Sequence, residues 1–166
     1  MEQENKPALT ATLQEVKNYL REHYHKGVEC PACGQLTRLY RRPLTSAMAY
    51  ALLLIYHHSN PNHDWMHVEK YLKTAAPDLN LRGDFHKLVL WNLLEAKKDT
   101  HKNGSPRNGF YKITDQGVGF IKGKFPLPSH VLIYNGKVQG FGTKRIFFQD
   151  VMKTKFDFVA LMEEVV

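Results

Sequence analysis

The sequence has few cysteines and no long apolar run. It contains only two cysteines in 166 residues, too few for the disulfide framework of a small secreted domain. Its longest apolar stretch, residues 47–56, falls short of the roughly 18 residues that predict a membrane span. The first ten residues are polar and acidic, which does not resemble a secretory leader. These features predict a cytoplasmic protein without a membrane segment.

The sequence also lacks the motifs of familiar enzyme classes. It has no glycine-rich phosphate loop, and no Ser or Cys nucleophile lies beside a suitable base in a known motif. Nine histidines invite a metal-dependent enzyme as an alternative. However, the neighbours His57 and His58 point in different directions on a helix, and no Glu separates a histidine pair as in zinc proteases. We therefore predict a protein that binds and does not catalyse.

Positive charge is in excess and is unevenly spread. The net charge is +7. Residues 1–60 hold 7 Lys/Arg and 5 Asp/Glu, residues 61–124 hold 11 and 7, and residues 125–166 hold 5 and 4. The middle of the chain thus carries most of the excess. A basic surface there would hold DNA through its phosphates without sequence preference; the alternative is a basic face that only meets water.

The first 43 residues are predicted to form an N-terminal helix and a cysteine turn. In Leu9–His25 the apolar residues recur at helical spacing, and Thr10 or Thr12 is a candidate for the N-cap. Residues 36–42 follow as a short, alternating, basic segment. Its expected core anchors are Leu36 and Tyr40, and its outward residues are Arg38, Arg41 and Arg42. The guanidinium fork matches phosphate oxygens, so these arginines are candidate DNA contacts, or else they only solubilise a strand edge.

The two cysteines form a Cys-x-x-Cys-Gly motif, at Cys30 and Cys33. Two thiolates at this spacing can bind one zinc ion, and a structural zinc takes four ligands. His23 and His25 lie a few residues upstream and are candidates for the missing ligands, and a second subunit of a homodimer is another source. A metal-free turn remains an alternative. A thioredoxin-like redox pair is less favoured because the motif does not lie in a βαβ unit.

Residues 44–124 predict three helices. Thr45 or Ser46 begins the first, which extends to about His58 and is apolar enough to be the central core helix. Asp64 is expected to cap the second helix, Trp65–Lys73, with Trp65 facing inward.

The third helix begins near Arg82 or Gly83 and includes Asp84–Trp91. Its residues Phe85, Leu88 and Trp91 recur at intervals of three, which places them on one buried face. Asn92 tolerates a left-handed backbone and can therefore end this helix.

A hairpin and a closing helix follow. Residues 93–97 and 110–114 are predicted strands, and the turn between them is rich in Gly, Asn, Ser and Pro. Thr114 or Asp115 is expected to cap a last helix. Helix, hairpin and basic turn together resemble the DNA-reading half of a winged helix-turn-helix protein, which often carries a similar G-x-Y-x-[IL]-T-x-x-G wing. The resemblance implies DNA contacts from the third helix and the wing: Arg82, His86, Lys87, Lys98, Lys102, Arg107 and Asn108.

Residues 125–166 are predicted to be a small appendage. We expect strands at His130–Tyr134 and Lys137–Phe141 joined by the two-residue turn Asn135-Gly136, a third short strand near Ile146, and a final helix at Phe156–Met162. A two-stranded hairpin is marginal by itself, so it is expected to pack through one apolar face: Val131, Ile133, Val138 and Phe141. The fold class is therefore α+β, a winged helix-turn-helix core (residues 44–124) with an N-terminal helix and cysteine turn (1–43) and this appendage (125–166).

The chain over residues 29–165 also resembles a group of small proteins encoded by bacteriophages and prophages. The shared positions are Cys30, Cys33, Gly34, Gln35, Tyr40, Arg41, Arg42, Leu44, Ser46, Met48, Ala49, Leu52, Trp65, His67, Val68, Asp84, Lys87, Leu88, Trp91, Gly109, Tyr111, Ile113, Thr114 and Gly117. The chain departs from the pattern at Asn92, where the group has Gly. The resemblance implies a phage or prophage origin and a bacterial host cell, and no particular activity.

Two functions follow as expectations. The first is a phage regulator of transcription that binds duplex DNA with its third helix and basic wing. The second is an interaction protein that uses the same fold to bind and redirect a host or phage protein. A basic stripe along the third helix and wing would favour the first, and a neutral or acidic third-helix face would favour the second.

Overall fold

The computed structural model describes residues 6–59, 62, 64–79, 81, 83–97 and 109–152. It is an α+β protein with small antiparallel sheets, as the sequence predicts. The residues group into two compact units, one from residues up to Arg42 together with Leu132–Gly140, the other from Pro43–Val131 together with residues from Phe141 onward. The predicted appendage is thus divided, because its hairpin groups with the N-terminal unit.

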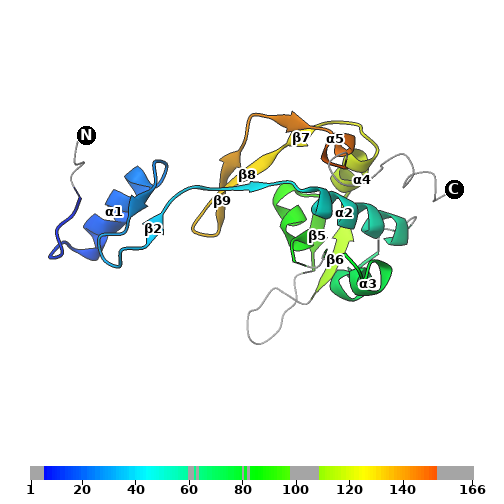
Figure 1. The fold of residues 1–166 in the computed structure, drawn as a ribbon, viewed down its shortest axis with the longest axis horizontal. Helices are drawn as coiled ribbons and strands as arrows, with labels where there is room; N and C mark the ends of the chain where they lie inside the picture. Colours follow the sequence, from blue (N-terminus) through cyan, green and yellow to red (C-terminus); the bar gives the residue numbers. More distant parts are fainter. Residues whose placement is uncertain are drawn as a thin grey trace. The chain divides into compact units, whose positions relative to one another are not determined.

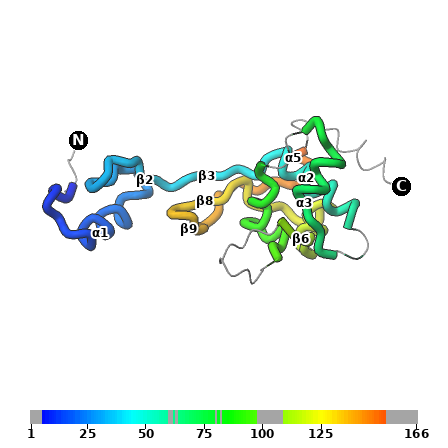
Figure 2. Tube along the Cα trace, turned by 90° about the horizontal axis from the view of Figure 1, so that it is seen from below, coloured from blue at the N-terminus to red at the C-terminus, as the bar shows by residue number. Residues whose placement is uncertain are grey.

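The second unit is built around the helix α2, Ser46–Ser59. It is apolar on all sides, and Met48, Leu52 and Ile55 are at most 2% exposed. Such a helix must be surrounded by other elements. Figures 1 and 2 agree in placing α3, β6 and α5 around it. The other elements of this unit, in chain order, are β4 Met66–His67, α3 Val68–Ala75, η1 Phe85–Trp91, β5 Leu94–Ala96, β6 Phe110–Ile113, α4 Asp115–Ile121, β7 Leu127–Pro128, β10 Arg145–Ile146 and α5 Phe148–Met152.

The second helix begins later than the sequence predicts. Asp64 does not cap it, and α3 starts at Val68 with His67 as the N-cap residue. Met66 and His67 instead form a short strand, in which they pair with Tyr111 and Phe110 of β6. The prediction of a helix from Trp65 was therefore wrong, because a pairing with residues far along the chain overrides the local helical pattern.

The third helix is a 3-10 helix, η1, and its apolar spacing of three matches the three residues per turn of that helix. Phe85, Leu88 and Trp91 are buried, as predicted. Asn92 ends the helix with φ 55°, in the left-handed region. This confirms that Asn takes the place of the Gly that commonly ends helices.

A three-stranded sheet follows η1, with the strand order β4-β6-β5. Leu94, Glu95 and Ala96 pair with Ile113, Lys112 and Tyr111 in antiparallel register. Thr114 then connects the sheet to α4. Its Oγ1 donates to the carbonyl oxygen of Asn92 (2.6 Å) and accepts from the backbone N–H of Gly117 (3.0 Å), so the predicted cap is confirmed.

The first unit contains α1, β1 and β2, together with most of β3, β8 and β9. In α1, Thr12 and Glu15 form a reciprocal capping box, which confirms Thr12 as the N-cap. Asn135 (φ 49°) and Gly136 (φ 69°) join β8 to β9 in a two-residue turn, as predicted. The elements are α1 Leu13–His23, β1 Val28–Glu29, β2 Leu36–Thr37, β3 Tyr40–Pro43, β8 His130–Tyr134 and β9 Lys137–Phe141, with the sheet orders β1-β2 and β3-β8-β9.

Several predicted core anchors near these strands are exposed. Leu36 is 53% exposed and Tyr40 is 41% exposed, so neither is anchored in a core. The predicted apolar face of the hairpin is also incomplete, because Val131 is buried while Val138 and Phe141 are 42% and 44% exposed. Short strands in two- and three-stranded sheets bury few of their side chains. The predicted helix at 156–162 lies outside the described residues.

None of the helices in the described part of the chain is both long and apolar enough to cross a membrane.

The burial of Trp91 yields a first prediction. Its indole Nε1 donates to the carbonyl oxygen of Pro128 at 2.8 Å, in the buried interior. Trp91→Phe leaves that carbonyl without its donor, so we expect the free energy of unfolding to fall by about 1–3 kcal/mol in a urea titration. Trp65→Phe, at a half-buried ring, is the matched control. Equal losses in the two variants would contradict the assigned role of the hydrogen bond.

The packing at Gly117 yields a second prediction. A Cβ at this position would collide with the Leu93 carbonyl oxygen and come within 2.8 Å of Ile113 Cγ1. Because one of these neighbours is backbone, Gly117→Ala should lower stability by about 1–3 kcal/mol. Gly140→Ala adds the same methyl group where nothing lies within 4 Å and should change the urea midpoint little. A Gly117→Ala protein as stable as wild type would show that α4 does not pack this closely on the strand.

Candidate functional site

Only some of the predicted DNA contacts lie among the residues that the structure describes. His86 and Lys87 lie on η1, and the three arginines lie on or beside β3. The remaining predicted contacts lie outside the described residues: Arg82, Lys98, Lys102, Arg107 and Asn108.

The outward face of η1 carries little net charge. Lys87 Nζ forms an ion pair with a carboxylate oxygen of Asp84. His86 is exposed, and Val89 is 37% exposed on the same short helix. Asp84 alone would repel a phosphate, but its carboxylate is paired with Lys87. The ion pair reduces the attraction that Lys87 offers to an approaching phosphate.

The β4-β6-β5 sheet has a second candidate surface on its outer face. Side chains alternate between the two faces of a strand. Leu94, Tyr111 and Ile113 are buried and face the core. Phe110 and Lys112 alternate with these and therefore face outward. The paired strand adds Glu95, which lies opposite Lys112. Lys97 comes two residues after Glu95 and therefore lies on the same outer face.

The outer face places cations over aromatic rings. Lys112 Nζ lies 4.9 Å from the centre of the Trp65 ring and 3.0 Å from Glu95 Oε2. Lys97 Nζ lies 5.6 Å from the centre of the Phe110 ring. These distances are those of cation–π contacts. We call this set the sheet patch: Trp65, Glu95, Lys97, Phe110 and Lys112.

The sheet patch combines residues that the sequence analysis separated. Lys97 and Lys112 lie in the predicted strands 93–97 and 110–114, and neither Trp65 nor Phe110 was predicted to have a binding role. Trp65 was predicted to face inward on a helix, yet it is half-buried and precedes β4. Phe110 is 37% exposed. The alternation of Phe110, Tyr111 and Lys112 along one strand was the signal that placed Phe110 and Lys112 on the same face.

The three predicted arginines are exposed. Arg38 and Arg42 lie 5.2 Å and 5.8 Å from the centre of the Tyr40 ring, so this exposed ring packs against cations in place of a core. The guanidinium groups still face solvent, where they can meet phosphate oxygens.

The cysteine motif forms the turn between β1 and β2. Val28 and Glu29 pair with Thr37 and Leu36. The backbone N–H of Cys30 donates to the Gln35 carbonyl and that of Gly34 donates to the Cys30 carbonyl, both at 2.8 Å. Gly34 has φ 73°, a left-handed conformation that glycine adopts without strain. Both cysteines are free, and their thiols lie 3.5 Å apart.

The turn is arranged to favour a thiolate at Cys30. Hydrogen bonds from the backbone N–H groups of Ala32 and Cys33, and then from the Cys33 side chain, lower the pKa of the Cys30 thiol below its usual value. A thiolate is the form of cysteine that binds metals. The turn thus places two sulfur atoms side by side.

The two candidate histidines do not join the cysteines in the structure. His23 Nδ1 lies 2.8 Å from the Tyr19 carbonyl oxygen, and its ring stacks on Tyr19. The His25 ring contacts that of Tyr24, with ring centres 3.9 Å apart. Within the residues that the structure describes, no group of three or more His, Cys, Asp or Glu side chains could hold a metal ion.

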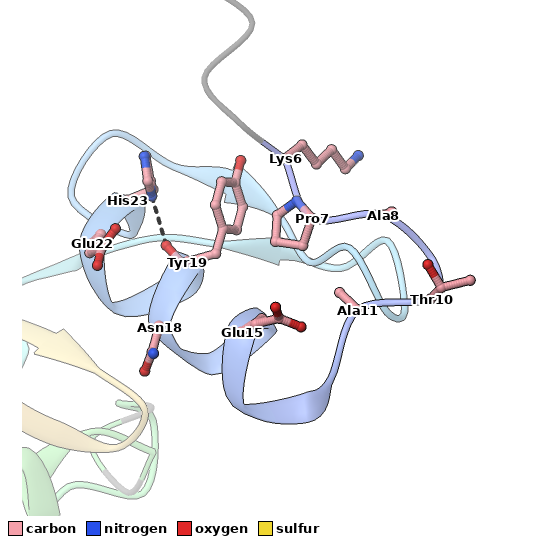
Figure 3. A pocket seen from close by; sticks show the side chains of 10 residues that line it. All are labelled: Lys6, Pro7, Ala8, Thr10, Ala11, Glu15, Asn18, Tyr19, Glu22 and His23. Atoms are coloured by element: carbon pink, nitrogen blue, oxygen red, sulfur yellow. Dashed lines mark hydrogen bonds between the residues drawn. The ribbon is translucent and has the colours of Figure 1, made fainter.

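A shallow groove of about 760 Å³ lies between the N-terminal segment and α1 (Figure 3). Its polar groups serve the local fold. The Glu15 carboxylate accepts from the backbone N–H of Thr12 at 2.7 Å, which lowers its pKa. Lys6 lies 3.7 Å from the Glu29 carboxylate, and His23 is held on Tyr19.

Another histidine, His57, is half-buried on α2. Burial lowers the pKa of the His57 ring below its usual value. Among the described atoms its Nε2 has no hydrogen-bond partner. The adjacent His58 stacks on Tyr71, with ring centres 4.2 Å apart. The neighbouring histidines thus point to different surroundings, as the sequence predicts.

Comparison of the chain with models of protein families, with curated protein sequences and with solved structures gives no match.

Proposed function

We propose that this protein is a winged-helix protein of phage or prophage origin that binds duplex DNA and regulates transcription. The observation that carries the proposal is the element order of the second unit. Helices α2 and α3 flank the short strand β4, η1 follows, and the hairpin β5–β6 closes the sheet in the order β4-β6-β5. This order of three helices and three strands supports a winged helix, in which the third helix and the β5–β6 connection meet DNA.

The sequence of the β5–β6 connection supports a contact with phosphates. Residues 97–112 contain five Lys/Arg and one acidic residue. Lys97 and Lys112 stand at its two ends on the outer face of the sheet, each over an aromatic ring. Lysines of this kind neutralise phosphates and release counterions, which gives binding that weakens with salt. The rings of Trp65 and Phe110 add flat apolar surface beside them.

The ion pair on η1 supports the alternative function, which is binding to a protein partner. With Lys87 paired to Asp84 and Val89 exposed, η1 presents a nearly neutral surface with an apolar side chain. Such a surface suits a protein partner better than a phosphate backbone. The alternative is therefore an interaction protein that binds a host or phage protein through η1.

The sheet patch is tested by removing its two lysines. We expect Lys97→Ala with Lys112→Ala to weaken binding to a random duplex about tenfold or more at low salt, and to reduce the slope of log K against log salt by about 2. Fluorescence anisotropy over a salt series measures both quantities. Lys122→Ala with Lys124→Ala removes the same charge at two exposed lysines near the end of α4 and is the matched control.

Equal weakening in both double variants would indicate a response to net charge alone and would contradict the assigned surface. Wild-type protein that does not bind duplex DNA at low salt would overturn the DNA-binding proposal and favour the protein partner.

The role of η1 is tested by releasing Lys87. Asp84→Asn removes a negative charge and frees the lysine from its ion pair. If η1 faces DNA, affinity should rise about threefold to tenfold and the salt slope should steepen by about 1. Glu22→Gln makes the same charge change on α1 and should alter affinity much less. Unchanged affinity in Asp84→Asn would exclude η1 from the DNA contact and leave it available for a protein.

A further inference from the structure

The Cys-x-x-Cys turn has the geometry of one half of a zinc site. In a tetrahedral zinc–thiolate site with Zn–S bonds of about 2.3 Å, two sulfurs lie ~3.8 Å apart. The thiols of Cys30 and Cys33 are 3.5 Å apart, within a few tenths of an ångström of that spacing. A disulfide would require about 2.05 Å. The pair therefore needs only a small adjustment to hold one metal ion between its two sulfurs.

The scaffold of the turn fixes this arrangement before any ligand binds. Two backbone hydrogen bonds of 2.8 Å close the turn, from Cys30 to Gln35 and from Gly34 to Cys30. The β1–β2 pairing holds its base. Gly34 is left-handed, and no atom lies within 4 Å of the position a Cβ would take. A preformed pair of ligands lowers the ordering cost of metal binding.

The chain does not complete the site from its own described residues. Both of its cysteines are already in the turn. His23 and His25 are each held on a neighbouring tyrosine ring, and the described residues contain no group of three ligands. A structural zinc with only two protein ligands would be open, whereas structural sites are closed by four. A closed site therefore needs two ligands beyond this pair, and a second copy of the chain can supply them.

The turn is exposed enough for a second copy of the chain to reach it. Cys33, Gly34 and Gln35 are exposed at the tip of the β1–β2 hairpin, and Cys30 is half-buried. An exposed tip of this kind can meet the same tip of a second copy across a twofold axis, where the same residues contribute from both sides. We infer that Cys30 and Cys33 of two chains bind one zinc ion between them and that this shared site of four thiolates joins the protein into a dimer.

The inference is independent of the proposed DNA binding. The zinc site lies in the first unit, whereas η1 and the sheet patch lie in the second. A twofold dimer would double the number of DNA-binding units in one particle. However, the metal content and the mass can be measured without any DNA, so either proposal can fail by itself.

The decisive experiment measures zinc content and molar mass on the same full-length sample. Protein purified with zinc present and free zinc then removed should contain about 0.5 zinc per chain, as expected for one tetrahedral site shared by two chains. Light scattering coupled to size exclusion should give the mass of a dimer. A chelator should release the zinc and yield monomers, because the metal supplies the contact.

Variants and a spectroscopic probe distinguish the ligand set. Cys33→Ser should lose the zinc and the dimer together, while His23→Ala with His25→Ala should keep both. Cobalt(II) in place of zinc should give the strong sulfur-to-metal charge-transfer absorption of four thiolates, at one cobalt per two chains. Circular dichroism of Cys33→Ser checks that the variant still folds.

Three results would overturn the inference. One zinc per monomeric chain would mean that the chain completes its own site. A dimer that persists in chelator would mean that the metal does not join the subunits. The third result is a protein without zinc in which mild oxidation joins Cys30 and Cys33 in a disulfide, and which takes up no cobalt after reduction. That result would mean that the turn is a redox pair.

Discussion

The burial of α2 is the constraint on which the second unit depends. Because this helix is apolar on every side, each of its faces must be covered, and α3, η1, β6, α4 and α5 all pack on it. That requirement fixes which face of the β4-β6-β5 sheet points inward, since Leu94, Tyr111 and Ile113 must join the same core. The outer face is then left for polar and aromatic residues. The position of the sheet patch is thus a consequence of how the core is closed.

On both candidate surfaces, lysines that could attract phosphates are held in ion pairs. Two lysines that could meet phosphates, Lys87 and Lys112, are each paired with a carboxylate, from Asp84 and Glu95 respectively. Exposed pairs of this kind contribute little to stability, but they reduce the local positive potential. Lys97 and Lys112 also lie over aromatic rings. The charge offered to a partner is therefore set by these pairings as well as by the net charge of the chain.

The two units expose different kinds of side chain. The first unit presents exposed arginines and a tight turn with two adjacent thiols, and the second presents basic and aromatic side chains on a sheet. A metal-joined dimer would give each particle two copies of the second unit. Two linked binding units gain affinity through a high effective local concentration, without any new contact. The zinc proposal would in this way add to a DNA-binding role, although it does not depend on one.

The sequence by itself determined the features that depend on neighbours along the chain. Asn92 ends η1, Thr12 and Thr114 cap helices, Asn135 and Gly136 form a two-residue turn, and the spacing of Phe85, Leu88 and Trp91 defines a buried face. Each follows from local backbone preferences or periodicity. Only the tertiary structure decided that Met66 and His67 form a strand, because their partners in β6 lie more than forty residues away. It also decided that Leu36 and Tyr40 are exposed and that Trp65 lies over Lys112. Local sequence cannot determine these features because burial and side-chain neighbours depend on which distant segments pack together.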